Sequence, residues 1–184
     1  MSKIILASKS PRRQELIKLI TEDFICIPSN VPEIVPDNTK PEDVSQVLAS
    51  LKAQDIYRKN PNDIVIGCDT VVICNNKVLG KPENQQKAKE MLKMLSGNKH
   101  KVITGCSVIK DNKEQIFKCV TEVEFYKLTD EEIDNYIASG EPFDKAGAYG
   151  IQGRGSLFVK GISGDYFNVV GLPVSMLARK LREI

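Results

Sequence analysis

The spacing of apolar and polar positions predicts alternating strands and helices over the first half of the chain. Short apolar runs at residues 3–7, 24–28 and 64–68 are bounded by polar residues, as buried strands are. Segments 11–20 and 84–95 instead repeat apolar residues at helical spacing. In the second of these segments four apolar residues share one helix face: Ala88, Met91, Leu92 and Leu95.

Turn and cap residues extend this pattern along the chain. Residues 39–42 (TKPE) are typical of a capping box, which opens a helix that ends near Tyr57. Asn75-Asn76 predicts a hairpin turn, and Asp111-Asn112 predicts a second one between strands at 101–109 and 115–125.

The last third of the chain combines helices with a glycine-rich segment. A helix starts at residues 129–132 and ends at Gly140, a glycine-rich loop follows at 147–155, a strand at 157–159 and a closing helix at 173–184. The order of elements predicts an α/β fold with a mixed β-sheet flanked by helices.

Composition narrows the class of protein. The 184 residues are enough for a single domain spanning 1–184, and a net charge of +2 gives no reason to expect nucleic acid or membrane as partner. No apolar run approaches a membrane span, and the first residues lack the apolar region of a signal peptide. We therefore expect a cytoplasmic protein.

The cysteines and the single histidine do not indicate a zinc site. The five cysteines lack a Cys-x-x-Cys pair and are interpreted as reduced core residues: Cys26, Cys68, Cys74, Cys106 and Cys119. His100 leaves too few ligands for zinc, and without a nucleophile motif beside it we favour a structural or surface role.

Residues 8–13 (SKSPRR) join the first strand to the first helix and form a candidate phosphate site. Pro11 is pre-set for a first helical turn, where free N–H groups attract anions. The guanidinium groups of Arg12 and Arg13 match phosphate oxygens, and Ser8 adds a hydroxyl. The alternative is an ordinary capped helix with solvated arginines.

Acidic and basic residues elsewhere in the chain are further candidates for a site that acts on phosphate groups. Asp69 follows the buried strand 64–68 and suits a metal ligand or general base, unless it is a turn residue. Glu33 lies in a polar loop and can equally be a solvated residue. Lys52 has small and apolar helix neighbours, so it either faces the sheet or snorkels to water. Lys81 is held between Gly80 and Pro82.

The glycine-rich loop carries Gln152, whose amide both donates and accepts, as reading the edge of a nucleobase requires. The loop lacks the Gly-Lys-Ser/Thr ending of a Walker motif. The alternative is a tight structural loop with an exposed glutamine. Taken together, these residues equip a protein for metal-assisted attack of water on a phosphoanhydride.

Six motifs resemble the Maf family of nucleoside triphosphate pyrophosphatases over essentially the whole chain. They are LASKSPRR (6–13), DTVV (69–72), GKP (80–82), SGNKHKVITG (96–105), DKAGAYGIQG (144–153) and GDYFNVVGLP (164–173). Lys9 departs from the small residue usual in the family, and the candidate site residues are intact.

The resemblance implies hydrolysis of a nucleoside triphosphate to the monophosphate and diphosphate. It implies a divalent cation and Asp69 as proton acceptor, and we expect Mg²⁺ or Mn²⁺ to bridge Glu33, Asp69 and the substrate. Five residues would hold the phosphates: Ser8, Arg12, Arg13, Lys52 and Lys81. It further implies a fold similar to inosine triphosphate pyrophosphatases, with two lobes around a cleft, and a homodimer.

Three positions match family residues tied to substrate choice: Arg12, Thr70 and Gln152. The loop resembles that of the subfamily acting on dTTP and UTP, whereas the 7-methyl-GTP subfamily has glutamate in place of Gln152. A glutamine can pair with the acceptor–donor–acceptor edge of uracil or thymine, and a glutamate only accepts.

Our leading hypothesis is a pyrophosphatase for dTTP, UTP and modified pyrimidine nucleotides. One alternative is the same chemistry on 7-methyl-GTP or another modified purine. The other is a nucleotide-sensing regulator of septum formation, since the family is also associated with arrest of cell division.

Overall fold

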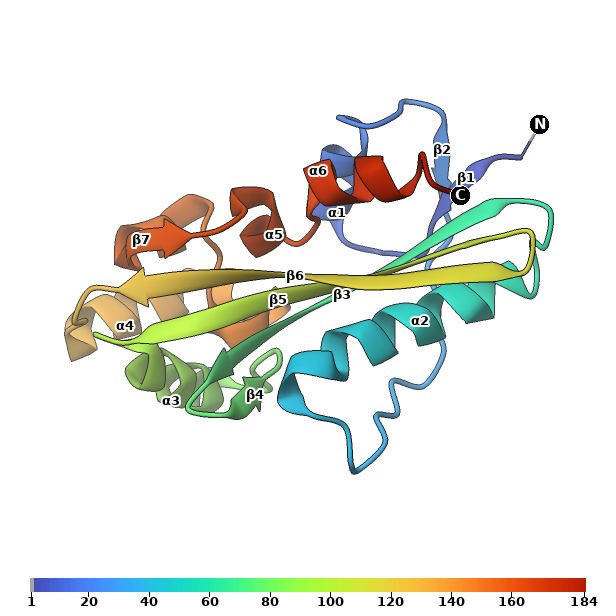
Figure 1. Cartoon of the computed structure of the whole chain (residues 1–184). Helices are drawn as coiled ribbons and strands as arrows, with labels where there is room; N and C mark the ends of the chain where they lie inside the picture. The colour runs from blue at the N-terminus through green and yellow to red at the C-terminus, as the bar shows by residue number, and fades with distance from the viewer. Residues whose placement is uncertain (1) are drawn as a thin grey trace. The chain divides into compact units, whose positions relative to one another are not determined.

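The computed structural model describes residues 2–184, which contain one mixed seven-stranded sheet (Figure 1). Its strand order is β2-β1-β3-β5-β6-β7, with β4 paired to β3. The strands are β1 (Ile4–Leu6), β2 (Phe24–Cys26), β3 (Ile64–Cys74), β4 (Lys77–Leu79), β5 (Lys99–Lys110), β6 (Lys113–Phe125) and β7 (Val159–Ser163). β1 is parallel to β2 and β3, whereas β4 and β7 are antiparallel to their partners. The predicted α/β fold with a mixed sheet is confirmed.

Helices and 3₁₀ turns connect these strands. The α-helices are α1 (Pro11–Ile17), α2 (Val44–Tyr57), α3 (Gln85–Leu95), α4 (Asp130–Ala138), α5 (Tyr166–Val170) and α6 (Val174–Lys180). The 3₁₀ turns are η1 (Pro41–Asp43), η2 (Glu141–Asp144), η3 (Ala146–Ala148) and η4 (Gly153–Phe158). Both predicted hairpin turns are present, and their Asn and Asp residues have the positive φ that such turns need.

The chain divides into two compact units. Unit 1 contains the described residues up to Thr70 together with Thr104–Cys119 and Gly171–Ile184. Unit 2 contains Val71–Ile103 and Val120–Val170. Strands β3, β5 and β6 therefore each contribute to both units, while a cleft between two lobes stays a prediction.

In unit 1, α2 packs so closely against the sheet that its backbone contacts glycines of β3 and β5 directly. A Cβ added to Gly67 on β3 would lie 2.2 Å from the Ala49 carbonyl oxygen, and one on Gly105 would lie 2.4 Å from the Ser45 carbonyl. α1 and α6 cover the other face of this unit's strands (Figure 1). The close approach of α2 brings its residue Lys52 toward β3.

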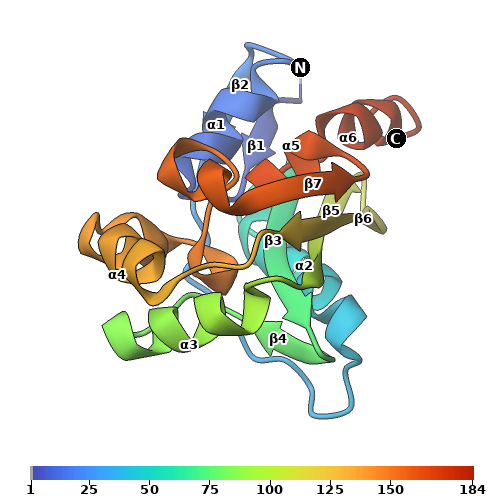
Figure 2. The ribbon, with the colours of Figure 1, turned by 90° about the vertical axis from the view of Figure 1, so that its left-hand side faces the viewer.

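In unit 2, α3 and α4 contact each other and lie side by side (Figure 2). Their buried faces join β5 and β6 in one apolar cluster that includes Leu92, Phe125, Ile133 and Tyr136. The predicted amphipathic helix 84–95 is confirmed, and the Asn84 side chain caps it by accepting from the Lys87 N–H at 2.9 Å.

Two sequence predictions about elements are wrong. No capping box forms at 39–42 among the described residues, because Lys40 precedes Pro41 and is extended, and α2 follows the turn η1 instead. Residues 157 and 158 belong to η4, which Ser156 Oγ tightens by donating to the Gly153 carbonyl at 2.6 Å, so β7 starts at Val159. The closing helix predicted at 173–184 is present as α6 but ends at Lys180, and the short helix α5 that precedes it was not predicted.

Candidate active site

Asp69 lies inside β3 and not at a strand end, which corrects the sequence prediction. β3 continues to Cys74 because β4 pairs with its last residues. The parallel partner β1 ends earlier, where Leu6 pairs with Ile66. Asp69 therefore lies three positions beyond the end of β1, and its side chain is only 13% exposed.

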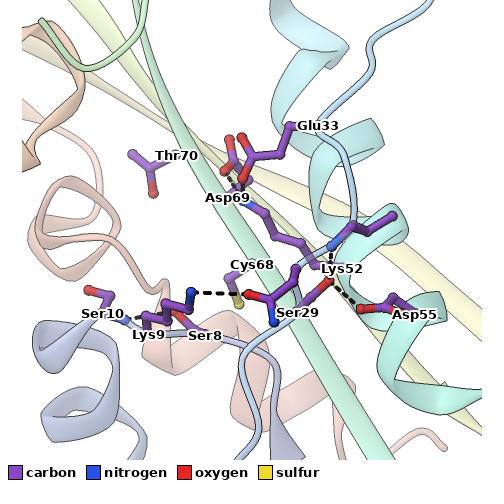
Figure 3. Close-up of polar contacts among 12 residues, drawn as sticks. Ser8, Lys9, Ser10, Ser29, Glu33, Lys52, Asp55, Cys68, Asp69 and Thr70 are labelled. Atoms are coloured by element: carbon purple, nitrogen blue, oxygen red, sulfur yellow. Dashed lines mark hydrogen bonds and ion pairs between the residues drawn. The ribbon is translucent and has the colours of Figure 1, made fainter. Parts of the chain in front are cut away.

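Lys52 connects Asp69 to a second carboxylate (Figure 3). Its Nζ lies 2.6 Å from Asp69 Oδ1 and 2.9 Å from Glu33 Oε1. The lysine side chain is 15% exposed and points from α2 to β3, so it faces the sheet and does not snorkel to water. The structure thus brings three of the predicted site residues into one ion-pair cluster, which we call the acid–lysine cluster: Glu33, Lys52 and Asp69.

The loop that carries Glu33 is fastened to α2. Ser29 Oγ donates to Asp55 Oδ2 at 2.7 Å and accepts the Val31 N–H at 3.1 Å (Figure 3). The bonds from Ser29 and Lys59 hold the pKa of Asp55 below its usual range, which keeps it an acceptor. Because Asp55 and Lys52 are three residues apart on one helix, α2 positions both the lysine and the loop.

Burial sets the protonation chemistry of Asp69. Desolvation raises the pKa of this carboxyl group; the charges of Lys52 and Arg13 oppose that rise, and the charge of Glu33 adds to it. A carboxylate with a raised pKa is a stronger base than an exposed one. This favours Asp69 as a proton acceptor over a carboxylate in water.

Arg13 binds protein acceptors on every nitrogen of its guanidinium group. Nε donates to the Gly171 carbonyl at 2.8 Å, and Nη1 donates to the Cys68 carbonyl at 2.8 Å. Nη2 donates to Thr70 Oγ1 at 3.0 Å, and Ser8 Oγ lies 3.4 Å from Nη1. These contacts position β3 around Asp69, and the phosphate contact predicted for Arg13 stays a prediction.

Thr70 and Ser8 are also held within this network. Thr70 Oγ1 lies 2.9 Å from Thr104 Oγ1 on β5. Ser8 is buried, and its Oγ accepts the Ser10 N–H at 3.2 Å. Arg12, next to Arg13 on α1, is half-buried. The SKSPRR segment therefore lies in unit 1 with the acid–lysine cluster.

The other two predicted site residues, Lys81 and Gln152, are exposed and belong to unit 2. Their loops are bonded to each other within that unit, because the Gly147 N–H donates to the Gly80 carbonyl at 3.0 Å. His100 is buried and bonds Tyr149 through Nε2 at 2.7 Å, consistent with the structural role that we favoured.

The donor set fits a hard divalent cation that also binds substrate. Among residues 2–184 no three His, Cys, Asp or Glu side chains gather into a self-sufficient metal site. The paired carboxylates Glu33 and Asp69 suit Mg²⁺ or Mn²⁺, which commonly take one or two protein carboxylates and complete their shell with phosphate oxygens and water. The cluster therefore fits a nucleotide-bound metal better than a permanent protein-bound one.

Sequence reasoning did not find Ser29, Asp55 or Thr104 as supports of this site. Asp55 could have been found from the sequence, since it follows Lys52 by three residues and so lies on the same face of α2. Ser29 and Thr104 could not have been found in this way, because only the fold brings them to their partners.

Fold and site together define an α/β protein with an acid–lysine cluster in which Lys52 and Asp69 are largely buried and Glu33 is exposed. The chain belongs to the Maf family: the family profile, described as Maf-like protein, matches residues 3–184. This confirms the resemblance seen in the motifs.

Curated relatives are similar over the whole chain. A dTTP/UTP pyrophosphatase of Bacillus cereus is 50% identical over 183 residues, covering 100% of this chain and 96% of the relative. Its counterpart in another strain of that species is 51% identical with the same coverage. A solved structure of the Staphylococcus aureus Ham1 protein is 16% identical and covers 66% of this chain and 71% of its own, with a TM-score of 0.48, too low to support an argument.

No helix within the described part of the chain is long and apolar enough to cross a membrane.

Proposed function

We propose that the protein is a nucleoside triphosphate pyrophosphatase that hydrolyses dTTP and UTP to the monophosphate and diphosphate. The observation that carries this proposal is the buried Asp69, ion-paired to Lys52 beside the second carboxylate of Glu33. The names of relatives at 50% identity over the whole chain support the reaction and the substrates.

Asp69 accepts the proton of a water molecule that attacks the α-phosphorus. A bond forms between the water oxygen and phosphorus, and the bond from phosphorus to the oxygen bridging to the β-phosphate breaks, so diphosphate leaves. Lys52 orients Asp69 and supplies positive charge beside the reacting phosphate. A divalent cation held by Glu33 and Asp69 would supply further charge neutralisation.

The remaining predicted residues bind the substrate or support the residues around it. Lys81 and Arg12 bind phosphate oxygens, and Arg13 positions β3 from inside the protein. Ser8 contributes the buried hydroxyl next to Arg13. Gln152 reads the base, because its amide can both donate to and accept from the edge of uracil or thymine.

Diphosphate release with Mg²⁺ or Mn²⁺ tests this proposal across dTTP, UTP, CTP, dATP, GTP and 7-methyl-GTP, with the products identified. We expect dTMP or UMP with diphosphate from dTTP or UTP, and much slower release from the other nucleotides. Preference for 7-methyl-GTP would keep the chemistry and overturn the assignment of Gln152. Nucleotide binding without turnover would overturn the enzymatic proposal and favour a sensing role.

A further inference from the structure

The backbone around Gln152 is held by one carboxylate that the reaction does not use. Glu141, at the start of η2, accepts the Arg154 N–H through Oε2 at 3.0 Å and the Gly155 N–H through Oε1 at 3.2 Å. Both donors lie two or three residues beyond Gln152. Charge-assisted bonds of this kind are stronger than neutral ones, so Glu141 fixes the second half of the loop.

Tyr136 on α4 extends this anchor to the first half of the loop. Its hydroxyl donates to Glu141 Oε1 at 3.2 Å and lies 3.4 Å from the Gly150 N–H. Burial, reinforced by the charge of Glu141, raises the pKa of Tyr136, so the phenol stays protonated and able to donate. One carboxylate and one phenol thus contact backbone N–H groups on both sides of Gln152.

The glycines of the loop match this arrangement. Gly153 has φ +69°, and a Cβ there would lie 3.0 Å from both Glu141 carboxylate oxygens. A Cβ on Gly155 would lie 2.3 Å from the Gly150 carbonyl oxygen. The loop therefore closes tightly onto Glu141, and only glycine fits at these points.

A second anchor holds the residue before Gly150. Tyr149 is buried, bonds His100 through its hydroxyl at 2.7 Å and packs edge-on against Phe125 with ring centres 4.6 Å apart. The loop is therefore fixed at residues 149–150 and again at 154–155. Gln152 lies between these points with its side chain exposed.

We propose that Glu141 is a specificity-positioning residue, which holds the backbone of residues 150–155 so that the Gln152 amide meets the pyrimidine edge in one orientation. The inference rests on the proposed function of Gln152. Glu141 binds the backbone of the loop and has no assigned contact with substrate or reacting atoms. Its loss should therefore weaken base discrimination and leave the chemical step largely intact.

The test compares Glu141→Gln with the control Glu132→Gln. Glu132 is also a unit 2 carboxylate that accepts a backbone N–H, that of Thr129 at 2.7 Å, but it caps the opposite end of α4. For each variant kcat and KM are measured with UTP and with CTP. We expect Glu141→Gln to lower the UTP/CTP ratio of kcat/KM about tenfold, mainly through the KM for UTP. The control should keep the wild-type ratio.

Amide hydrogen exchange gives a readout that needs no activity. In Glu141→Gln the amides of Gly150, Arg154 and Gly155 should exchange faster than in the wild type, while those of α3 stay protected. If Glu141→Gln does not fold, Tyr136→Phe removes only the hydroxyl and should lower the UTP/CTP ratio by a smaller factor in the same direction.

The outcomes separate this inference from the proposed function. A wild-type protein without turnover on any nucleotide would overturn both. An active wild type whose UTP/CTP ratio is unchanged in folded Glu141→Gln would overturn the role of Glu141 alone. An equal fall of the ratio in the Glu132→Gln control would also overturn it. A general loosening of unit 2 would then be enough to explain the loss of base discrimination.

Discussion

Among single residues, Asp69 is the group on which the chemistry depends. Replacement by Asn keeps its size but removes the proton acceptor, so we expect kcat to fall about 10²–10⁴-fold. Steady-state diphosphate release measures this fall, and circular dichroism checks that the variant folds.

The matched control is Asp37→Asn, a change of the same kind in the exposed part of the loop that carries Glu33. It should leave kcat within about twofold of the wild type, since exposed substitutions away from special contacts have small effects. Turnover of Asp69→Asn at the wild-type rate would remove Asp69 from the mechanism.

His100 makes stability depend on pH. Burial lowers the pKa of this side chain from 6.5 to about 4 in the folded protein. As pH falls below 6.5 the unfolded chain takes up the proton first, so stability is complete above pH 6.5 and is lost between 6.5 and 4.

Urea unfolding near pH 7.5 and pH 5 should show the wild type losing about 2 kcal/mol more than His100→Gln, which does not titrate. Because the chain has a single histidine, the difference between the two proteins isolates this group. Equal losses in both proteins would mean that His100 is not buried in its neutral form.

The residue types of the site could be predicted from the sequence, but their contacts could not. Asp69 and Lys52 stood out by their apolar neighbours, and the structure joins them at 2.6 Å. Arg13 stood out as a phosphate ligand, yet its partner Gly171 is 158 residues away along the chain. Local sequence has no signal for a bond of that kind.

Among elements, α2 controls the site through its close approach to the sheet. Gly67→Ala would place a methyl group against the backbone of Ala49 and Ala53, on both sides of Lys52. We expect the free energy of unfolding to fall by about 1–3 kcal/mol. kcat/KM should fall as well, because a displaced α2 moves Lys52 away from Asp69.

The control for this prediction is Gly161→Ala on β7, where an added Cβ meets nothing within 4 Å. It should change stability by less than about 0.5 kcal/mol. Urea unfolding and diphosphate release on the two variants make the comparison. If Gly67→Ala keeps the stability and the activity of the wild type, α2 can shift without loss of either.

Predictions of elements succeeded where the pattern was long or the turn chemistry specific. The helix at 84–95 and both hairpin turns are confirmed. Failures lie at Pro41, whose effect on the residue before it outweighs the capping signal, and at η4, where glycine and serine form local turns in an apolar-looking run. Both are cases of local backbone chemistry overriding a composition pattern.

On the scale of the whole molecule, Arg13 fastens distant segments of unit 1 together. Its guanidinium joins α1 to β3 and to Gly171, where the last segment of that unit begins. A lysine has one ammonium group and cannot reach all these acceptors, so Arg13→Lys should lower the free energy of unfolding by about 2–4 kcal/mol.

Urea unfolding compares Arg13→Lys with Arg58→Lys, the same change at an exposed position after α2. The control should be nearly neutral. A raised KM for UTP with unchanged stability in Arg13→Lys would instead make Arg13 a direct phosphate ligand, as the sequence suggested.

The split of unit 1 into three stretches of chain also bears on how the protein is made. A ribosome finishes the sequence of unit 2 at Val170, before it starts the last stretch of unit 1 at Gly171. Arg13, although translated early, gains its Gly171 partner only then. Because Arg13 fixes β3 next to Asp69, the acid–lysine cluster lacks this support until Gly171 has been translated and has docked, so unit 1 is completed only after all residues of unit 2 have been made.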